Sequence, residues 1–193
     1  MAAECVVPPG VVHDRPLVEV HAGGVDEWVP IKRVKMFTNA FIVQDGKILL
    51  GYKKRGIGQG LFNGFGGKVE AGETPAEAAV RELREEAGID APLRQIGMLS
   101  FKVEDVEEAF HIDIFMAEEH TGTIIETEEM RPQWFSTTTQ TDGDILPPIP
   151  YENMWADDIF WLPLLLSKQK FAGRADFNTG NKMLKWWFGK ETS

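Results

Sequence analysis

Two segments rich in β-branched and aromatic residues open the regular part of the chain. They run from Val34 to Val43 and from Lys47 to Tyr52, and Asp45-Gly46 lies between them. An Asp-Gly pair in this position favours a tight turn, so the pattern predicts a β-hairpin. Three more strands are predicted over Gly97 to Val103, Phe110 to Ala117 and Met130 to Phe135, with Pro132 kinking the last one or placing it at a sheet edge.

A helix with well-defined ends is predicted between the hairpin and the later strands. Thr74 is suited to be its N-cap, Pro75 to occupy the first helical position, and Glu77 to complete a capping box. Gly88 is then expected to end the helix in the left-handed conformation that glycine adopts readily.

The remaining segments complete the predicted organisation. Residues 155–169 carry aromatic residues and leucines at helical spacing, and Pro163 is expected to limit where that helix begins. Residues 1–33 are expected to form a partly disordered N-terminal extension, in which Leu17 to His21 can add an edge strand. Residues 34–193 are expected to form a single domain. Strands that alternate with helices in this order indicate an α/β or α+β sandwich.

Composition and charge exclude several classes of protein. The 193 residues carry a formal net charge of −10, which disfavours non-specific binding to a nucleic-acid polymer. The apolar stretch from Phe160 to Leu166 is too short to span a membrane. Cys5 is the single cysteine, so an intrachain disulfide and a cysteine-based zinc site are excluded, and a reducing compartment is expected. The N-terminus has no secretory or transit pattern, so the cytosol is the default, with the nucleus or mitochondrion as alternatives.

Three carboxylates share one face of the first predicted helix. Glu82, Glu85 and Glu86 stand at positions i, i+3 and i+4, and like charges so close together destabilise an isolated helix. A hard divalent cation with oxygen ligands would offset this repulsion, whereas the alternative is an ordinary solvated acidic helix. A second face carries small apolar residues suited to packing on a sheet: Ala76, Ala79, Leu83 and Ala87.

The spacing around these glutamates favours the metal-binding interpretation. Gly67, Glu73, Arg81-Glu82-Leu83, Glu85-Glu86 and Gly88-Ile89 together resemble the complete Nudix box. The resemblance implies an α/β Nudix fold, an α/β/α sandwich around a mixed sheet, and hydrolysis of a nucleoside diphosphate linked to a further group.

By position in the box, the resemblance also implies a role for each residue. Glu82, Glu85 and Glu86 and the backbone carbonyl of Gly66 would bind Mg²⁺, for which Mn²⁺ is a possible substitute. Arg81 would orient a glutamate, and Glu73 would support the loop before the helix. One of the glutamates would act as general base, and the sequence leaves open which one.

Segments outside the box resemble a Nudix subfamily, the mammalian MutT homologue that hydrolyses oxidised purine nucleoside triphosphates. They are residues 53–56, 63–69, 129–132 and 154–171. This resemblance implies that Trp155 stacks on the base, that Asp157 and Asp158 bind its edge, and that Glu129 is a further metal ligand, for which Glu126 and Glu128 are alternatives. The substrate-binding residues implied in this way are Thr38, Lys53, Asn63, Phe65, Gly67, Lys68, Phe101, Phe110, Trp155, Ala156, Asp157 and Asp158.

Structural roles remain open for several of these residues. Trp155 can belong to a core, Asp157-Asp158 can be a helix N-cap pair, and Lys53 to Arg55 can be a solvated basic patch. Four residues also depart from the mammalian pattern. Ala156 stands in place of proline, and Phe62, Ile57 and Phe110 replace a tryptophan, a phenylalanine and a methionine. These changes keep the expected pocket apolar but alter its shape.

The expected function is Mg²⁺-dependent conversion of 8-oxo-dGTP or 2-hydroxy-dATP to the monophosphate and pyrophosphate, which removes mutagenic nucleotides from the pool. The alternatives are a Nudix hydrolase for a dinucleotide, a diphosphoinositol phosphate or an O6-methylated purine nucleotide, and a Nudix-fold module that binds nucleotides without hydrolysing them. A DNA-reading domain is disfavoured by the net charge. The expected partner is a small-molecule nucleotide, with no membrane and no nucleic-acid polymer, and a monomer is expected.

Overall fold

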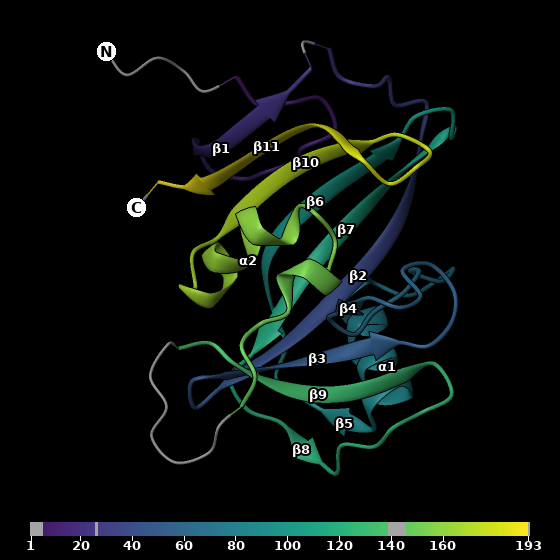
Figure 1. Ribbon diagram of the computed structural model, residues 1–193, viewed down its shortest axis with the longest axis vertical. Helices are drawn as coiled ribbons and strands as arrows, with labels where there is room; N and C mark the ends of the chain where they lie inside the picture. Colours follow the sequence, from purple (N-terminus) through teal and green to yellow (C-terminus); the bar gives the residue numbers. More distant parts are fainter. Residues whose placement is uncertain (1–5, 26, 139–145, 193) are drawn as a thin grey trace. The chain divides into compact units, whose positions relative to one another are not determined.

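The computed structural model describes residues 6–25, 27–138 and 146–192 (Figure 1). Cys5, on which the redox argument rests, lies outside the described residues. The contact pattern divides the chain into two compact units. The first unit consists of the described parts of 1–37, 96–113 and 156–193, and the second of those of 38–95 and 114–155. Strands β2, β6 and β7 each contribute residues to both units.

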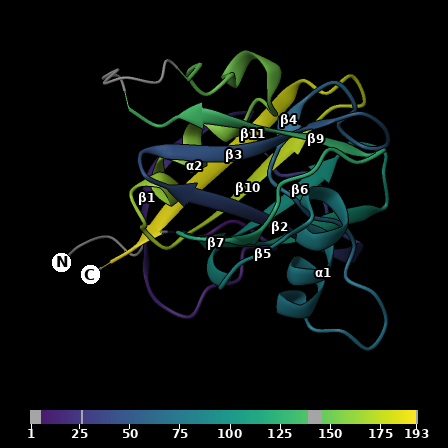
Figure 2. The same ribbon diagram turned by 90° about the horizontal axis from the view of Figure 1, so that it is seen from below.

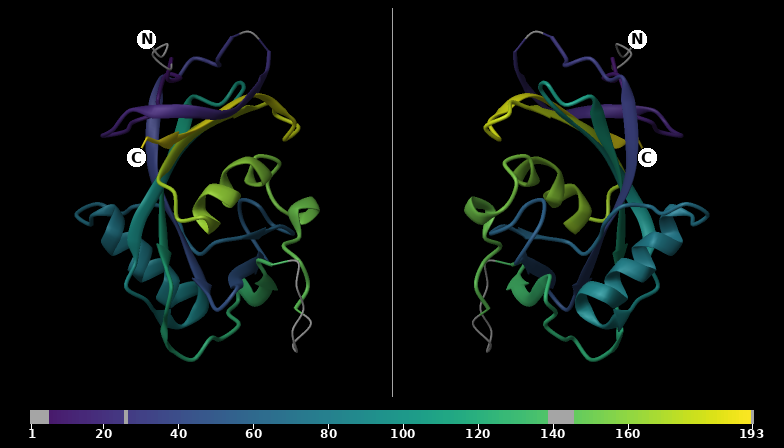
Figure 3. Two further views of the ribbon diagram at one scale, coloured as in Figure 1. Left: turned by 90° about the vertical axis from the view of Figure 1, so that its left-hand side faces the viewer. Right: turned by 90° about the vertical axis from the view of Figure 1, so that its right-hand side faces the viewer.

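The first unit is a mixed sheet with one helix. Its elements are β1 (Leu17–Gly24), the start of β2 (Arg33–Gln44), most of β6 (Arg94–Val103), the start of β7 (Glu108–Ala117), α2 (Asp158–Leu166), β10 (Phe171–Phe177) and β11 (Met183–Glu191). The strands β1, β11, β10 and β6 are neighbours in this order, and β10 runs antiparallel to β11 but parallel to β6. Helix α2 packs against β10 and β11 (Figure 3).

A buried ion pair fastens the N-terminal segment to this unit. Arg174 and Asp176 on β10 are almost fully buried, and the Arg174 Nε donates to Asp176 Oδ1 over 2.7 Å. Arg174 Nη1 also donates to the Pro9 carbonyl over 2.8 Å, and Asp176 Oδ2 accepts from the Val29 backbone N–H over 2.7 Å. Both charges therefore have polar partners, which a buried ion pair requires.

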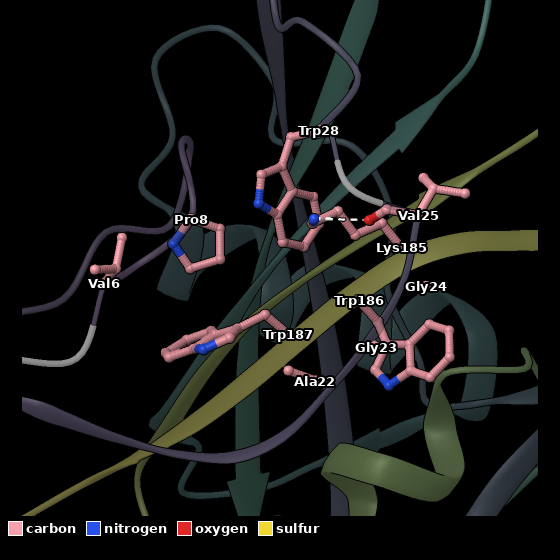
Figure 4. A pocket seen from close by; sticks show the side chains of 10 residues that line it. All are labelled: Val6, Pro8, Ala22, Gly23, Gly24, Val25, Trp28, Lys185, Trp186 and Trp187. Carbon is pink, nitrogen blue, oxygen red and sulfur yellow. Dashed lines mark hydrogen bonds between the residues drawn. The ribbon is translucent and has the colours of Figure 1, made fainter.

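The N-terminal segment also forms one wall of a pocket of about 320 Å³ against β11 (Figure 4). Its aromatic residues are Trp28, Trp186 and Trp187, and the Lys185 ammonium donates to the Val25 carbonyl over 2.8 Å. The Trp28 ring lies beside two cations, at 4.7 Å from Arg174 Cζ and 5.1 Å from Lys185 Nζ. These contacts of Trp28 and Lys185 hold the segment in place.

The second unit carries the longer helix. Its elements are the rest of β2, β3 (Lys47–Lys53), β4 (Phe62–Asn63), α1 (Pro75–Ala87), β5 (Ile89–Asp90), the end of β7, β8 (Thr121–Gly122), β9 (Met130–Ser136) and the short helix η1 (Tyr151–Asn153). Strand β3 pairs antiparallel with β2, β4 and β9, and β5 pairs with β8. Helix α1 packs against β5, which lies beside it in Figure 2, and against β9.

Local signals in the sequence account for the ends and the buried face of α1. The Thr74 hydroxyl accepts from the Glu77 N–H, the Glu77 side chain accepts from the Thr74 N–H, and Gly88 ends the helix with φ of 72°. The core of the unit gathers residues from α1, the sheet and the loops: Ile42, Leu49, Phe65, Leu83, Ala87, Ile89, Ala117 and Met130. One prediction needs correction, because Ala76 is exposed and Ala78 is buried instead. The packed face is therefore rotated slightly from the predicted stripe.

Most predicted elements are confirmed. The hairpin turn has positive φ at both Asp45 and Gly46, and the predicted edge strand is present as β1. The second helix is shorter than predicted, and Pro163 lies inside it and does not limit its start. The missing N–H of Pro163 costs one intrahelical hydrogen bond, and the helix ends soon afterwards at Leu166.

The α/β class with a mixed sheet is confirmed. No helix in the described part of the chain has the length and apolarity needed to cross a bilayer. That residues 34–193 form one domain stays a prediction.

Candidate functional site

The three glutamates of α1 differ strongly in exposure. Their side chains are 14% exposed for Glu82, 59% for Glu85 and 4% for Glu86. Burial disfavours the charged form of a carboxyl group, and it raises the pKa of Glu82 and raises that of Glu86 to about 7. The helix therefore presents two partly desolvated carboxylates and one solvated carboxylate.

Arg81 connects these carboxylates to the loop before the helix. Its Nη1 donates to Glu82 Oε1 over 2.8 Å and to Glu85 Oε2 over 3.3 Å, and its Nη2 donates to Glu73 Oε1 over 2.7 Å. These hydrogen bonds keep the Arg81 guanidinium charged and hold the pKa of Glu73 below its ordinary value. Glu73 also accepts from the Glu70 N–H over 2.7 Å. Arg81 thus links the glutamates of α1 to Glu73, while the roles expected for Arg81 and Glu73 stay predictions.

Lys53, at the end of β3, lies between Glu86 and Glu129. Its ammonium donates to Glu86 Oε1 over 2.9 Å and to Glu129 Oε1 over 2.6 Å. The bond from Lys53 lowers the pKa of Glu129, whereas for Glu86 the desolvation caused by burial outweighs the nearby cation. Of the three acidic residues proposed after β8, Glu129 is thus the one next to the helix glutamates, and Glu126 pairs with Lys54 over 2.7 Å. Lys53 belongs to this cluster and is not part of a solvated basic patch.

A glycine loop brings the backbone close to the glutamates. The Gly66 N–H donates to Glu86 Oε2 over 2.8 Å, and the Thr38 N–H donates to the Gly67 carbonyl over 2.9 Å. A Cβ atom on Gly67 would lie 2.4 Å from Glu82 Oε1, so only glycine leaves room for that carboxylate. The presence of glycine at position 67 of the Nudix box therefore has a steric explanation.

Chemically, this cluster suits a divalent cation. Its donors are carboxylate oxygens, which hard cations prefer, and burial disfavours the charge of Glu82 and Glu86 unless a cation is near. In the described residues no group of three or more His, Cys, Asp or Glu side chains converges as a ready metal cage. Instead Glu82 is hydrogen-bonded to Arg81, and Glu86 to Lys53.

Several of the predicted base-contacting residues lie in the second unit. Thr38 is buried on β2 and Asn63 lies on β4, and the Gly58 backbone lies beside the indole of Trp155. Phe65 has a structural role, because its ring is fully buried in the core and both its backbone groups bond to Ala40. Lys68 is exposed, and its carbonyl accepts from Arg81.

The other predicted base-contacting residues lie in the first unit. Phe101 packs edge-on against Phe177 and Phe110 against Phe37, while Ala156 is exposed. Asp157 and Asp158 are both buried.

Asp157 is a buried carboxyl group and not a capping residue. Its side chain makes no cap hydrogen bond, although it stands at the N-cap position of α2. Oδ2 accepts from the Trp161 indole N–H over 3.0 Å, and Oδ1 is buried with no partner among the described residues. Burial raises the pKa of Asp157 above its ordinary value. The main cause of this upward pKa shift is desolvation of the carboxyl group.

Sequence reasoning missed Asn39, which donates from Nδ2 to Asn63 Oδ1 over 2.7 Å. It also missed the contact that brings Lys53 to Glu129, two residues that are 76 positions apart. No local signal marks either contact, because each depends on how strands pair across the sheet.

Comparisons with known proteins identify the family of this chain. The family model of the NUDIX domain matches residues 24–147. The chain is 45% identical over 144 residues to the "Oxidized purine nucleoside triphosphate hydrolase" of Danio rerio, which covers 74% of this chain and 86% of that protein. It is 42% identical over 153 residues to the protein of the same name from Mus musculus. That match covers 79% of this chain and 92% of the mouse protein.

Among solved structures, the fold resembles a MutT protein from Bacillus halodurans with a TM-score of 0.66 and 24% identity, over 80% of this chain and 97% of that one. Enzymes of the family generally use divalent metal ions. With the family model matching more than half of its length and two close relatives matched over most of theirs, the chain belongs to the NUDIX family.

Proposed function

We propose that this protein hydrolyses oxidised purine nucleoside triphosphates, such as 8-oxo-dGTP and 2-hydroxy-dATP, to the monophosphate and pyrophosphate. The observation that carries the proposal is the 42–45% identity to two enzymes named for this activity, over 86% and 92% of their lengths. The intact glutamate helix supports the chemistry, since a binding module would not need it. Removal of these nucleotides would prevent their incorporation into DNA.

We further propose Mg²⁺ as the cofactor, with Mn²⁺ as a substitute. The Glu82, Glu85, Glu86 and Glu129 carboxylates and the Gly66 carbonyl would hold it. A bound divalent cation would neutralise the polyphosphate and make a water molecule more acidic. Arg81 keeps the Glu82 carboxylate in place through its 2.8 Å hydrogen bond. Lys53 keeps Glu86 and Glu129 near one another.

For the nucleobase, we propose recognition by the residues that the family resemblance implies. Trp155 would stack on the purine, and Asn63 would donate a hydrogen bond to it. Thr38, Lys68, Phe101, Phe110, Ala156 and Asp158 would contribute further contacts. Because its pKa is raised to about 7, a large share of Asp157 would be protonated near neutral pH and could donate to the base edge, a role that an ionised carboxylate cannot take.

The test is a substrate panel with Mg²⁺ that contains 8-oxo-dGTP, 2-hydroxy-dATP, O6-methyl-dGTP, dGTP, a dinucleoside polyphosphate and ADP-ribose. We expect the highest kcat/KM for the two oxidised purines and a loss of that preference in Trp155→Ala. Activity confined to another substrate would support the proposed hydrolase activity but overturn the proposed substrate class. Tight binding without turnover would overturn the proposal that the protein is an enzyme.

We also propose that the protein is a monomer, which light scattering tests. It would act on the cytosolic nucleotide pool, with the nuclear or mitochondrial pool as the alternative.

A further inference from the structure

Asn39 is a polar residue in a place that suits an apolar one. It lies on β2 next to Thr38 and is 9% exposed, within the run of buried residues of that strand. We propose that Asn39 is a positioning residue: it fixes the orientation of the Asn63 side-chain amide so that the NH₂ end of Asn63 faces the nucleobase. This inference rests on the proposed role of Asn63 in binding the base.

A single backbone group identifies the oxygen and nitrogen ends of both amides. The Gly64 N–H lies 2.8 Å from one terminal atom of the Asn63 amide. A backbone N–H can only donate, so that atom is the oxygen, Oδ1. The terminal atom of Asn39 that lies 2.7 Å from the same oxygen must also donate, and it is therefore Nδ2.

As a result, the two ends of the Asn63 amide have different tasks. Oδ1 accepts two hydrogen bonds, from Gly64 and from Asn39. Nδ2 has no protein partner in the part of the chain that the structure describes, and it is not among the buried atoms that lack one. The Asn63 amide is thus locked with its donor end available to a ligand.

Tight packing keeps Asn39 in this orientation. A Cβ atom on Gly64 would lie 2.3 Å from Asn39 Oδ1 and 2.7 Å from the Ala40 carbonyl, so the Asn39 amide lies directly against the Gly64 backbone. Asn39 Oδ1 is buried and has no hydrogen-bond partner among the described residues. An unpaired buried acceptor destabilises the folded state, and an apolar residue of the same size would avoid that cost. Stability alone therefore does not explain an asparagine here, whereas orientation of Asn63 does.

The ligand chemistry follows from the available NH₂ group. It would bind a carbonyl oxygen or an unprotonated ring nitrogen of the base, and it would disfavour a base with an N–H group at the same place. A site built around such a hydrogen bond discriminates against analogues that cannot make it. Asn39 would then determine specificity without touching the substrate.

The experiment is a double-mutant cycle. Asn39→Asp replaces the donor with an acceptor, so that Asn63 Oδ1 keeps only the hydrogen bond from the Gly64 N–H and faces a carboxyl oxygen. The Asn63 amide is then no longer held with its NH₂ end towards the base. Asn39→Leu removes the donor without adding a charge and is the second variant should Asn39→Asp fold poorly. Each is made in the wild type and in Asn63→Ala, and kcat and KM are measured on 8-oxo-dGTP, 2-hydroxy-dATP, dGTP and dATP. Gln44→Leu, on the same strand outside the site, is the control.

We expect Asn39→Asp to lower kcat/KM by about 10- to 100-fold in the wild type, mainly through KM and unequally for 6-oxo and 6-amino purines. In the Asn63→Ala background the same substitution should change neither KM nor the ranking of substrates. An equal loss in both backgrounds, or the same factor for all four nucleotides, would show a merely structural role and overturn the proposal. If the wild type prefers a different nucleotide, the proposed function fails, and the cycle on that nucleotide decides the role of Asn39 independently.

Discussion

The substitution Gly67→Ala separates the position of Glu82, a proposed metal-binding carboxylate, from the stability of the fold. A Cβ atom at residue 67 would lie 2.4 Å from Glu82 Oε1, and ordinary contacts of this kind begin at 3.4 Å. The Glu82 carboxylate would therefore have to move by about 1 Å. It is the end of a flexible side chain, and the φ of Gly67 is outside the left-handed region, so the backbone has no reason to shift.

The size of the effect follows from this displacement. A catalytic group that is about 1 Å out of place can lose about 100-fold in rate. We expect kcat/KM on the oxidised purine triphosphates to fall by about 100-fold and the Mg²⁺ concentration for half-maximal activity to rise. The Tm should change little, because the movement of one side-chain end costs little folding free energy.

Steady-state kinetics and thermal unfolding of the same samples test this prediction. Gly72→Ala is the matched control, since Gly72 has φ of +91° and a methyl group added there would meet nothing within 4 Å. It should cost about 1 kcal/mol of stability through backbone strain and leave kcat/KM unchanged. Full activity in Gly67→Ala would refute the steric argument. So would a loss of kcat/KM that is accompanied by a large fall in Tm.

Three further predictions concern stability. Thr74→Ala removes the helix cap and should cost about 1 kcal/mol in urea unfolding; no change in the midpoint would contradict a role for the capping box. Leu83→Ala opens a cavity in the core beneath α1 and should cost about 2–5 kcal/mol, whereas a loss below about 1 kcal/mol would mean that the site collapses. The pKa of Glu86 is raised from 4.5 to about 7, so the folded state binds its proton more tightly than the unfolded state. Without metal, stability should thus fall by about 3 kcal/mol as pH rises from about 4.5 to about 7, and Glu86→Gln should flatten this slope.

Local signals predicted the parts of the fold that are local. The capping residues of α1 and the Asp45-Gly46 turn depend on neighbours within four residues, and the structure confirms both. Strand β10 gave no such signal, because the polar Arg174 and Asp176 interrupt its apolar pattern. Their ion pair and their bonds to the N-terminal segment make burial possible, and the partners in that segment, Pro9 and Val29, are not visible from the sequence around them.

The candidate site divides in the same way. The spacing of Glu82, Glu85 and Glu86 fixes them on one helix face, so their shared location was predictable. Their unequal burial was not, since it depends on which strands cover the helix. The link from Lys53 to Glu86 and Glu129, and that from Asn39 to Asn63, join residues that strand pairing brings together.

The most direct test of the central claim is the identity of the products formed from 8-oxo-dGTP with Mg²⁺, measured by phosphorus NMR. We predict 8-oxo-dGMP and pyrophosphate in equal amounts, with dGTP hydrolysed more slowly, and a rate about 10²–10⁴-fold lower in Glu86→Gln. Release of orthophosphate, equal rates on 8-oxo-dGTP and dGTP, or full activity in Glu86→Gln would contradict the account.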